Sequence, residues 1–428
     1  MRDDRPDAPT ELILLPSLRA QRGPRGGLVL TRKYMEGAAE YARNWPGPVA
    51  SLVELDETPT TDMDHVEYMP GEGETALELR PSDPEALAKR LAGAAQVVAF
   101  LSRSELPMLN VCQQIGLPVV FVTEYSPRTE RQILAGEQMG PLRRLRRLLW
   151  LWRTERIRRA MLKRAAGLQC SGLPTYENYQ GLCADTLLFF DNRVRADEVI
   201  SDGAMSARTQ RLRQNEPLRL VFGGRMVPMK GVMELPRVAA ELRRQGVPFT
   251  LDIFGSGPQQ DALQHLIRTE GLQDQVILRG VLDFQTGWIP YLRDKADLFL
   301  CCHTQGDPSS TYPEVMSCGV PIAGYANDAF RGIVEVSGSG WAVPVFDAAA
   351  LARAIARLHR DRDAIVKAAF RARDFARSHV FEVTFAERTR HFVRNSRLPE
   401  LLKFEPVHDI AAPRARSRPS PTPFGPLH

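Results

Sequence analysis

Cysteine is scarce in this 428-residue sequence, and no two of its six cysteines form a CxxC pair. The absence of that spacing argues against a structural zinc site and against a disulfide framework. We expect the thiols to be buried in a protein of a reducing compartment. The cysteines are Cys112, Cys170, Cys183, Cys301, Cys302 and Cys318.

The sequence also lacks a long uncharged apolar run and a charged-then-apolar stretch at its N-terminus. These absences predict a cytoplasmic protein without a spanning helix or a secretion signal. A hydrophobic content of 43% and a charged content of 25% are typical of a soluble globular protein. The formal net charge is only +5, so we expect no nucleic-acid partner.

Apolar strand-like runs alternate with amphipathic stretches in the first half of the chain. This β-α-β alternation predicts a parallel sheet covered by helices on both faces. A glycine-rich stretch, 22–27, follows the first run. The predicted strands are 11–17, 48–55, 95–102 and 117–124, and the predicted helices are 33–45, 85–94 and 108–116.

The same alternation restarts at residue 218, after a polar stretch at 195–217 that is poor in strand-forming residues. The pattern predicts an α/β fold with two tandem Rossmann-like, doubly wound domains facing a cleft. The predicted strands are 218–224, 249–255, 275–280, 297–302 and 321–325, and the predicted helices are 231–246 and 259–271. The expected domains are 1–200 and 201–380, followed by a C-terminal helix in 381–404 that returns to the first domain and a disordered, Pro-, Ser- and Arg-rich tail in 405–428.

The loop GDPSSTYPEVMSCGVP, residues 306–321, follows the predicted strand 297–302 and leads into a short helix. Pro313 suits the first turn of a helix, and Ser310 or Thr311 can cap it. The helix would point its N-terminus at the cleft, where backbone N–H groups favour a phosphate. Glu314 is then either a plain helix-start acid or an acceptor of hydrogen bonds from sugar hydroxyls.

A second motif, VFGGRMVPMKG at 221–231, places two glycines, Arg225 and Lys230 after a strand. Gly223 and Gly224 let a ligand approach the backbone, and the two cations suit a diphosphate. Gly255 lies in a third glycine-rich turn, FGSGP. The Walker A and GxGxxG patterns are both absent. Each turn alone is typical of ordinary chain reversal, whereas the three together favour a nucleotide site.

Residues 218–380 resemble the C-terminal domain of the family 4 glycosyltransferases, which have the GT-B fold. The resemblance rests on FGGRMVPMKG, DIFGSGPQQDAL, QVILRG, ADLFLCC and PEVMSCGVPIAGY in that order. The first half is similar only in its β-α-β pattern and its glycine-rich first loop. The resemblance implies that Arg225 and Lys230 bind the donor's diphosphate and that Glu314 binds its ribose. It also implies that backbone amides around Ser310, Thr311 and Tyr312 help to hold the phosphate.

The chain departs from the family pattern of two glutamates separated by seven residues, because Gly306 stands eight positions before Glu314. The first glutamate of the family contacts the transferred sugar. Asp307 is a candidate for that role, and a structural acid in a turn is the alternative. Glu124 stands where many members have a histidine. It is either a polar contact in the cleft or a solvated acid at a strand end.

The resemblance implies a retaining reaction in which the leaving phosphate helps to deprotonate the acceptor, so we assign no separate base. Arg225 and Lys230 would stabilise the departing diphosphate. With these cations present we expect neither a metal nor a cofactor. Gly26 and Gly27, in the first glycine-rich stretch, would face the acceptor side of the cleft.

The stretch 141–167 combines many basic residues with a central run of leucines and tryptophans and carries a single acid, Glu155. Such a helix suits the surface of an anionic membrane, and we predict this contact through 142–164. The alternative is a surface helix that packs its apolar stripe on its own domain. A nucleic-acid patch is a weaker third interpretation.

We therefore predict an enzyme that moves a sugar from a nucleotide-diphosphate donor, a UDP- or GDP-sugar, to a saccharide or polyprenyl-linked acceptor. The resemblance implies cell-surface or exopolysaccharide synthesis, at the inner face of the plasma membrane. The alternatives are a sugar-nucleotide epimerase or phosphorylase on the same fold, and a catalytically degenerate binding or scaffold protein. A dehydrogenase is disfavoured by the missing dinucleotide motif.

Overall fold

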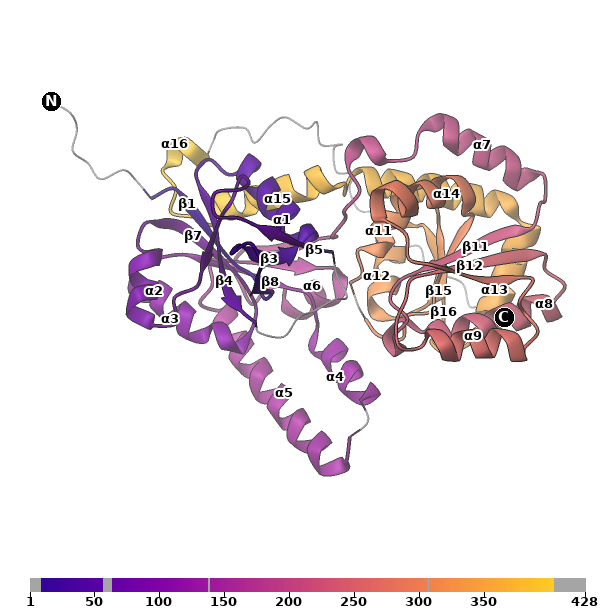
Figure 1. Cartoon of the computed structure of the whole chain (residues 1–428), viewed down its shortest axis with the longest axis horizontal. Coiled ribbons are helices and arrows are strands. Elements are labelled where there is room, and N and C mark those ends of the chain that lie inside the picture. The colour runs from indigo at the N-terminus through magenta and orange to yellow at the C-terminus, as the bar shows by residue number, and fades with distance from the viewer. Residues whose placement is uncertain (1–8, 57–63, 138, 307, 404–428) are drawn as a thin grey trace.

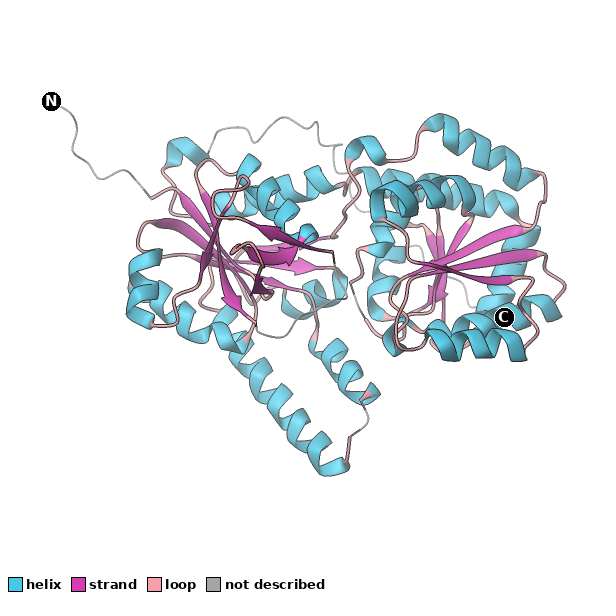
Figure 2. Ribbon diagram, in the orientation of Figure 1, coloured by secondary structure: helices cyan, strands magenta, loops and turns pink. Residues whose placement is uncertain are grey.

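The computed structural model describes residues 9–56, 64–137, 139–306 and 308–403. These residues form two α/β domains that lie side by side, each built around its own sheet (Figures 1 and 2). Asp307 and the tail at 405–428 lie outside the described residues. The two predictions that fall on them therefore stay predictions.

The first sheet has the order β10-β9-β8-β7-β1-β4-β2-β3-β5, with β6 paired to β4. Its central strands are parallel and are covered by apolar clusters on both faces. Six of its parallel strands are β1 (Glu11–Leu15), β4 (Val49–Leu55), β7 (Ala94–Phe100), β8 (Val119–Thr123), β9 (Gly167–Ser171) and β10 (Thr186–Phe189). The short strands at and near the edge are β2 (Arg19–Arg22), β3 (Leu28–Thr31), β5 (His65–Tyr68) and β6 (Ala76–Leu79).

The glycine-rich stretch 22–27 is not a simple loop between a strand and a helix, as the sequence suggested. It is the turn of the antiparallel hairpin formed by β2 and β3, closed by the Gly23 N–H donating to Gly27 O over 2.9 Å. Gly26 adopts a φ of 87° there. The Glu67 carboxylate accepts hydrogen bonds from the N–H groups of Arg25 and Gly27. The alternation rule missed the hairpin because its strands are only four residues long.

The second sheet is parallel throughout, in the order β13-β12-β11-β14-β15-β16. This is the doubly wound order in which the chain builds outward from β11 and then returns to β11's other side with β14. The strands are β11 (Leu218–Gly223), β12 (Phe249–Phe254), β13 (Val276–Gly280), β14 (Leu298–Cys301), β15 (Ile322–Tyr325) and β16 (Gly340–Val343).

Helices cover the faces of both sheets (Figure 2). Those of the first domain are α1 (Arg32–Asn44), α2 (Pro84–Leu91), α3 (Leu106–Gln114), α4 (Pro127–Gly136), α5 (Pro141–Leu162) and α6 (Leu173–Tyr179), with the 3₁₀ turn η1 (Arg103–Glu105). Those that follow are α7 (Asp202–Arg213), α8 (Leu235–Arg244), α9 (Gln260–Thr269), α10 (Ile289–Lys295), α11 (Thr311–Ser317), α12 (Asp328–Ser337), α13 (Ala348–Arg360), α14 (Arg362–Arg377), α15 (Phe381–Arg394) and α16 (Glu400–Lys403). The short turns are η2 (Ala196–Glu198), η3 (Pro228–Lys230), η4 (Val232–Glu234) and the π-turn η5 (Phe284–Trp288).

The helix predicted at 231–246 is interrupted at its start. Gly231 has a left-handed φ of 63° and separates η3 from η4, and α8 begins only at Leu235. A Cβ at Gly231 would lie 1.9 Å from the carbonyl oxygen of Cys302 at the end of β14. The glycine therefore allows η3 to approach the backbone that follows β14.

The C-terminal helix α15 lies on the first domain, next to α1 (Figure 1). Phe385 packs its ring 4.7 Å from the ring of Tyr41 on α1, and it belongs to the same apolar cluster as Leu12 of β1. The Arg388 guanidinium donates to Gln169 Oε1 of β9 over 2.8 Å. The chain thus crosses from the second domain back to the first after α14.

Helix α5 projects from the first domain as one arm of a hairpin with α4 (Figures 1 and 2). Every residue from 141 to 150 is exposed, whereas Met161 and Leu162 at the other end are buried. Only the C-terminal half of α5 therefore packs on its own domain. The alternative of a surface helix that packs its apolar stripe on its own domain therefore holds for the C-terminal half of α5 and not for residues 141–150.

Replacing Phe385 by Ala should lower the free energy of unfolding by about 3–5 kcal/mol, because a buried ring leaves a cavity. Phe370 is a matched control on α14, since it is 37% exposed. Its replacement by Ala should cost roughly 0.5 kcal/mol or less. Urea unfolding of both variants measures the difference. Similar losses would contradict a stabilising role for the returning helix.

Gly231→Ala should destabilise the protein far more than Gly246→Ala. Both glycines have positive φ, 63° and 68°, which costs a non-glycine residue about 1–2 kcal/mol. A Cβ at Gly246 meets open space, whereas one at Gly231 overlaps the Cys302 carbonyl. Urea midpoints of the two variants provide the measurement, and equal losses would argue against the close approach.

Candidate functional site

The switch point of the second sheet lies between β11 and β14, where Val221 pairs with Phe299. Ligands of doubly wound sheets bind beyond the carboxyl ends of the strands at this point. The segment 224–231 follows β11, and the segment 302–310 follows β14. These are the two motifs that the sequence singled out, and the fold brings them to one place.

Two of the predicted donor-site glycines are explained by packing. A Cβ at Gly223 would lie 2.4 Å from the ring of Trp288, and one at Gly255 would lie 2.0 Å from the Gly224 carbonyl oxygen. Gly224 N–H also donates to Phe254 O over 3.1 Å, which joins the two strand-end turns. The glycines thus hold the turns together, and their contact with a donor stays a prediction.

Arg225 and Lys230 provide two positive charges at the end of β11. Arg225 is exposed, and its guanidinium has no partner among the described residues. Lys230 is only 9% exposed and lies on η3, which Thr304 N–H ties to the other motif by donating to Met229 O over 3.0 Å. The described part of the site thus combines one exposed and one buried cation.

Glu314 lies in the first turn of α11, as predicted, and is 5% exposed. Burial raises the pKa of its carboxyl group, against the charges of Lys33 and Arg193. The helix has only seven residues. Ser310 is the N-cap residue but makes no side-chain cap bond.

The backbone N–H of Tyr312, one of the predicted phosphate donors, already has a partner within the loop. It donates to Ser309 O over 3.2 Å, and the ring of Tyr312 is buried. For Ser310 and Thr311 the predicted role as phosphate-binding amides remains a prediction. The Tyr312 hydroxyl instead meets Nδ1 of His303 at 3.1 Å.

His303, two residues after β14, was not among the predicted site residues. The imidazole is 1% exposed, and its Nε2 has no hydrogen-bond partner among the described residues. Burial lowers the pKa of His303 far below its ordinary value, and the charge of Lys230 adds to this effect. A buried polar nitrogen without a hydrogen-bond partner needs a physical explanation, and a bound ligand is one such explanation. Its place at the end of a predicted strand was the only signal in the sequence.

Lys33 was also missed, and it brings the two domains together electrostatically. Its Nζ lies 2.6 Å from Asp191, directly after β10, and the side chain is 45% exposed. Partial burial opposes the charge, yet the ion pair and the charges of Glu314 and Glu124 raise the pKa of Lys33. Lys33 lies at the start of α1, where the helix dipole disfavours a cation. A lysine at a helix start was the available signal.

Glu124 is exposed and follows β8, as the sequence predicted. Its effect on Lys33 places it near the ion pair with Asp191. Gly26 and Gly27 lie in the turn described above, and their role on the acceptor side stays a prediction.

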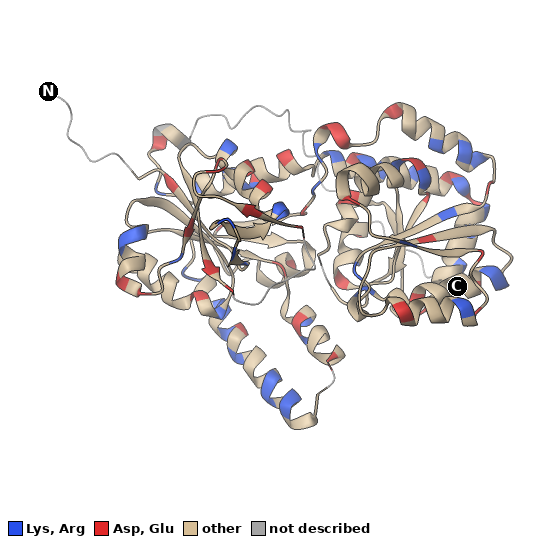
Figure 3. Ribbon diagram, in the orientation of Figure 1, with Lys and Arg blue, Asp and Glu red and all other residues tan. Residues whose placement is uncertain are grey.

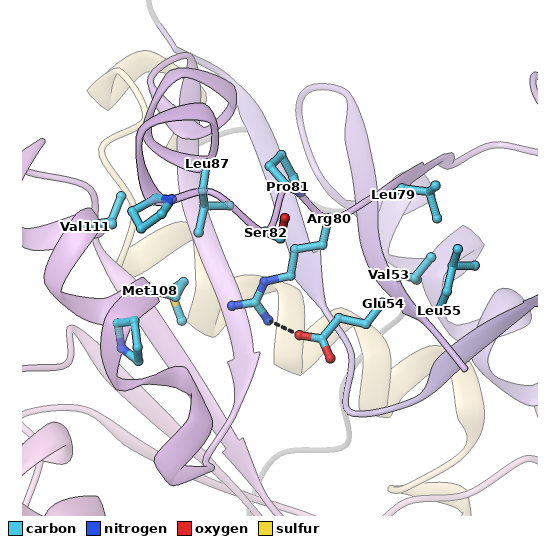
Figure 4. Close-up of a pocket in the computed structure, with 12 residues that line it drawn as sticks. Val53, Glu54, Leu55, Leu79, Arg80, Pro81, Ser82, Leu87, Met108 and Val111 are labelled. Carbon is cyan, nitrogen blue, oxygen red and sulfur yellow. Dashed lines mark ion pairs between the residues drawn. The ribbon is translucent and has the colours of Figure 1, made fainter. Parts of the chain in front are cut away.

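The first domain contains a pocket of about 460 Å³ beyond the carboxyl ends of β4 and β6 (Figure 4). Its walls are largely apolar, and Leu79 on the rim is 43% exposed. Arg80 crosses the pocket, with a two-point contact to Glu105 at 2.8 and 2.9 Å and an ion pair with Glu54 at 3.5 Å. The pocket is lined by Val53, Glu54, Leu55, Leu79, Arg80, Pro81, Ser82, Pro84, Leu87, Pro107, Met108 and Val111.

Within the described ranges, no group of three or more His, Cys, Asp or Glu side chains could hold a metal ion. All six cysteines are buried free thiols, as expected from their spacing. None of the described helices is long and apolar enough to cross a membrane.

Residues 206–377 match the family model "Glycosyl transferases group 1". Over 165 residues the chain is 31% identical to the putative colanic acid biosynthesis glycosyltransferase WcaL of Salmonella typhimurium. The aligned residues are 37% of this chain and 40% of that protein. The amylovoran biosynthesis glycosyltransferase AmsK of Erwinia amylovora is 28% identical over 165 residues, which are again 37% of this chain and 40% of that protein. The chain therefore aligns with about two fifths of the length of these relatives.

The fold is similar to that of HepE from Anabaena, solved with UDP, with a TM-score of 0.63, 14% identity and coverage of 90% of this chain and 99% of HepE. Sucrose-phosphate synthase from Thermosynechococcus elongatus gives a TM-score of 0.61 at 17% identity, covering 90% of this chain and 98% of that one. The predicted fold and the predicted resemblance are thereby confirmed. The second domain therefore matches the group 1 glycosyl transferases over residues 206–377, and the two domains have the GT-B fold.

Proposed function

We propose that the protein is a glycosyltransferase that moves a sugar from a nucleoside-diphosphate donor to a saccharide or lipid-linked acceptor, with retention of configuration. The observation that carries the proposal is the arrangement at the switch point. Arg225 and Lys230 follow β11, and the buried Glu314 follows β14. The two cations suit the diphosphate, and Glu314 suits the ribose hydroxyls.

Charge stabilisation is the main chemical task that this arrangement can perform. When the bond between the sugar and the diphosphate breaks, negative charge grows on the leaving phosphate oxygens. A guanidinium binds two such oxygens at once, and an ammonium acts as a point charge. Removing one such group from a site typically lowers turnover by about 10²–10³.

The proposed donor is a UDP-sugar, with a GDP-sugar as the alternative. Support comes from the HepE structures, whose contents are UDP, UDP with glucose, and UDP-glucose. The names of WcaL and AmsK support a role in polysaccharide synthesis. We place the enzyme in the cytoplasm. An epimerase or a scaffold protein is not favoured by these similarities.

Arg225→Ala and Lys230→Ala should each weaken nucleotide binding, because each removes a charge from the diphosphate site. In the wild-type protein, a nucleotide at a hundredfold over its Kd should stabilise the fold by about 2.7 kcal/mol. We expect a rise in Tm with UDP or GDP and their sugars, reduced in both variants. Differential scanning fluorimetry measures the shift.

Arg268→Ala is the matched control, since Arg268 is exposed on α9 of the same domain. It should respond to nucleotides as the wild type does. A folded wild-type protein that no nucleotide stabilises would sink the proposal. Donor-derived products formed without any acceptor would point to an epimerase instead.

The exposed half of α5 supports a second part of the proposal, an anionic bilayer as the surface on which the enzyme works. Large apolar side chains there are 39–72% exposed, and arginines lie between them (Figure 3). Arg147 stacks 4.4 Å over Trp150, and Arg156 lies 4.8 Å from Trp152. Leucines and tryptophans can enter the interface while the arginines meet lipid phosphates. The exposed apolar residues are Leu142, Leu145, Leu148, Leu149, Trp150 and Trp152.

Replacing Arg143, Arg144, Arg146 and Arg147 together by Gln should weaken vesicle binding. Each basic residue contributes about 1 kcal/mol near an anionic surface, so four substitutions should weaken binding by roughly a thousandfold. Flotation with vesicles that contain phosphatidylglycerol is the measurement. The control replaces four exposed arginines of the second domain, Arg243, Arg244, Arg268 and Arg371, by Gln. Equal binding by both variants would contradict the role of α5.

A further inference from the structure

Gly306, in the segment after β14, is held by the other domain. Its N–H donates to Gln132 Oε1 over 3.0 Å, and its carbonyl oxygen accepts from Thr129 Oγ1 over 3.1 Å. Both side chains lie on α4 of the first domain, and Thr129 is fully buried. One peptide segment of the second domain is therefore bound on both its polar atoms from across the domain boundary.

The packing explains why this position has no side chain. A Cβ at Gly306 would lie 3.1 Å from Thr129 Oγ1 and 3.4 Å from Asp328 Cβ. Asp328 is itself ion-paired with Arg128, the neighbour of Thr129, at 3.0 Å. Helix α4 thus occupies the space that a larger residue at 306 would need.

The same helix borders the proposed diphosphate site. Helix α4 packs against η3, which carries Lys230. Two nearby polar atoms of the segment after β14 are buried without a hydrogen-bond partner among the described residues, His303 Nε2 and Gln305 Oε1. Unpaired buried polar atoms are rare in folded proteins and need an explanation. These two atoms are therefore available to a polar ligand beside the turn that carries Lys230.

The amide of Gln132 is oriented by its contact with Gly306. A backbone N–H can only donate, so the carbonyl end of the Gln132 amide must face it, and the NH₂ end must point away. That NH₂ group has no hydrogen-bond partner among the described residues, and the side chain is half-buried. A donor group is therefore available next to a position where the second domain offers no side chain.

We propose that Gln132 of the first domain is a specificity-determining residue, whose NH₂ group donates a hydrogen bond to a hydroxyl of the transferred sugar. Thr129 is a positioning residue that holds Gly306 beside it. This inference rests on the proposed function and adds a contact between the first domain and the donor. The donor site is then complete only when the two domains meet at α4.

The test compares each nucleotide with its own nucleotide sugar: UDP with UDP-glucose, and GDP with GDP-mannose. Gln132→Leu should raise the Kd of the nucleotide sugar roughly tenfold, the effect of one lost hydrogen bond, and leave the Kd of the nucleotide within about threefold. Gln132→Glu keeps an oxygen for the Gly306 N–H and loses the donor. It should retain nucleotide binding and change the preference among UDP-glucose, UDP-galactose and UDP-N-acetylglucosamine. Isothermal titration provides all these values.

Arg131→Ala, an exposed residue of the same helix, is the control and should match the wild type. An equal loss of nucleotide and nucleotide-sugar affinity in Gln132→Leu would show a purely structural role and overturn the inference. Unchanged affinities would overturn it as well. If the wild-type protein binds none of UDP, UDP-glucose, GDP and GDP-mannose, the donor site itself is contradicted, and with it the proposed function on which the inference rests.

Discussion

The close approach of η3 to the backbone after β14 is the constraint on which the site depends. Gly231 makes it possible, because any side chain there would overlap the Cys302 carbonyl. The hydrogen bond from Thr304 N–H to Met229 O then fixes the two segments side by side. As a result, Lys230 lies beside His303, and the two motifs of the second domain form a single surface. Without this contact they would be two separate strand-end turns.

The two domains meet through polar contacts and through the packing of α6 against α12. Helix α4 binds Gly306, the pair of Lys33 and Asp191 lies near Glu314, and α15 crosses back to pack on α1. Charged groups of both domains therefore meet at the carboxyl ends of the strands. In the proposed function, this arrangement would let the first domain contribute to a donor site built mostly by the second.

The first domain has two further features that suit the acceptor side. The pocket crossed by Arg80 lies at the carboxyl edge of the first sheet, and η1, which carries Glu105, packs against α5 (Figure 4). The exposed half of α5 extends away from the body of the molecule (Figure 1). Helix α5 thus links the pocket to the surface proposed for the bilayer, and it also contacts α4.

The sequence by itself determined the fold class, the two sheets and the identity of the second domain. Short stretches of sequence were enough to reveal the apolar strands and the strand-end glycines. They were also enough to single out Arg225, Lys230 and Glu314. The β2–β3 hairpin, the break at Gly231 and the half-exposed α5 were missed or left open, because each is decided by what packs nearby. Lys33, His303 and Gln132 emerged only from the tertiary structure. Lys33 and Gln132 contact residues more than a hundred positions away, and His303 Nε2 has no partner in the part of the chain that the structure describes, so no local pattern in the chain encodes these features.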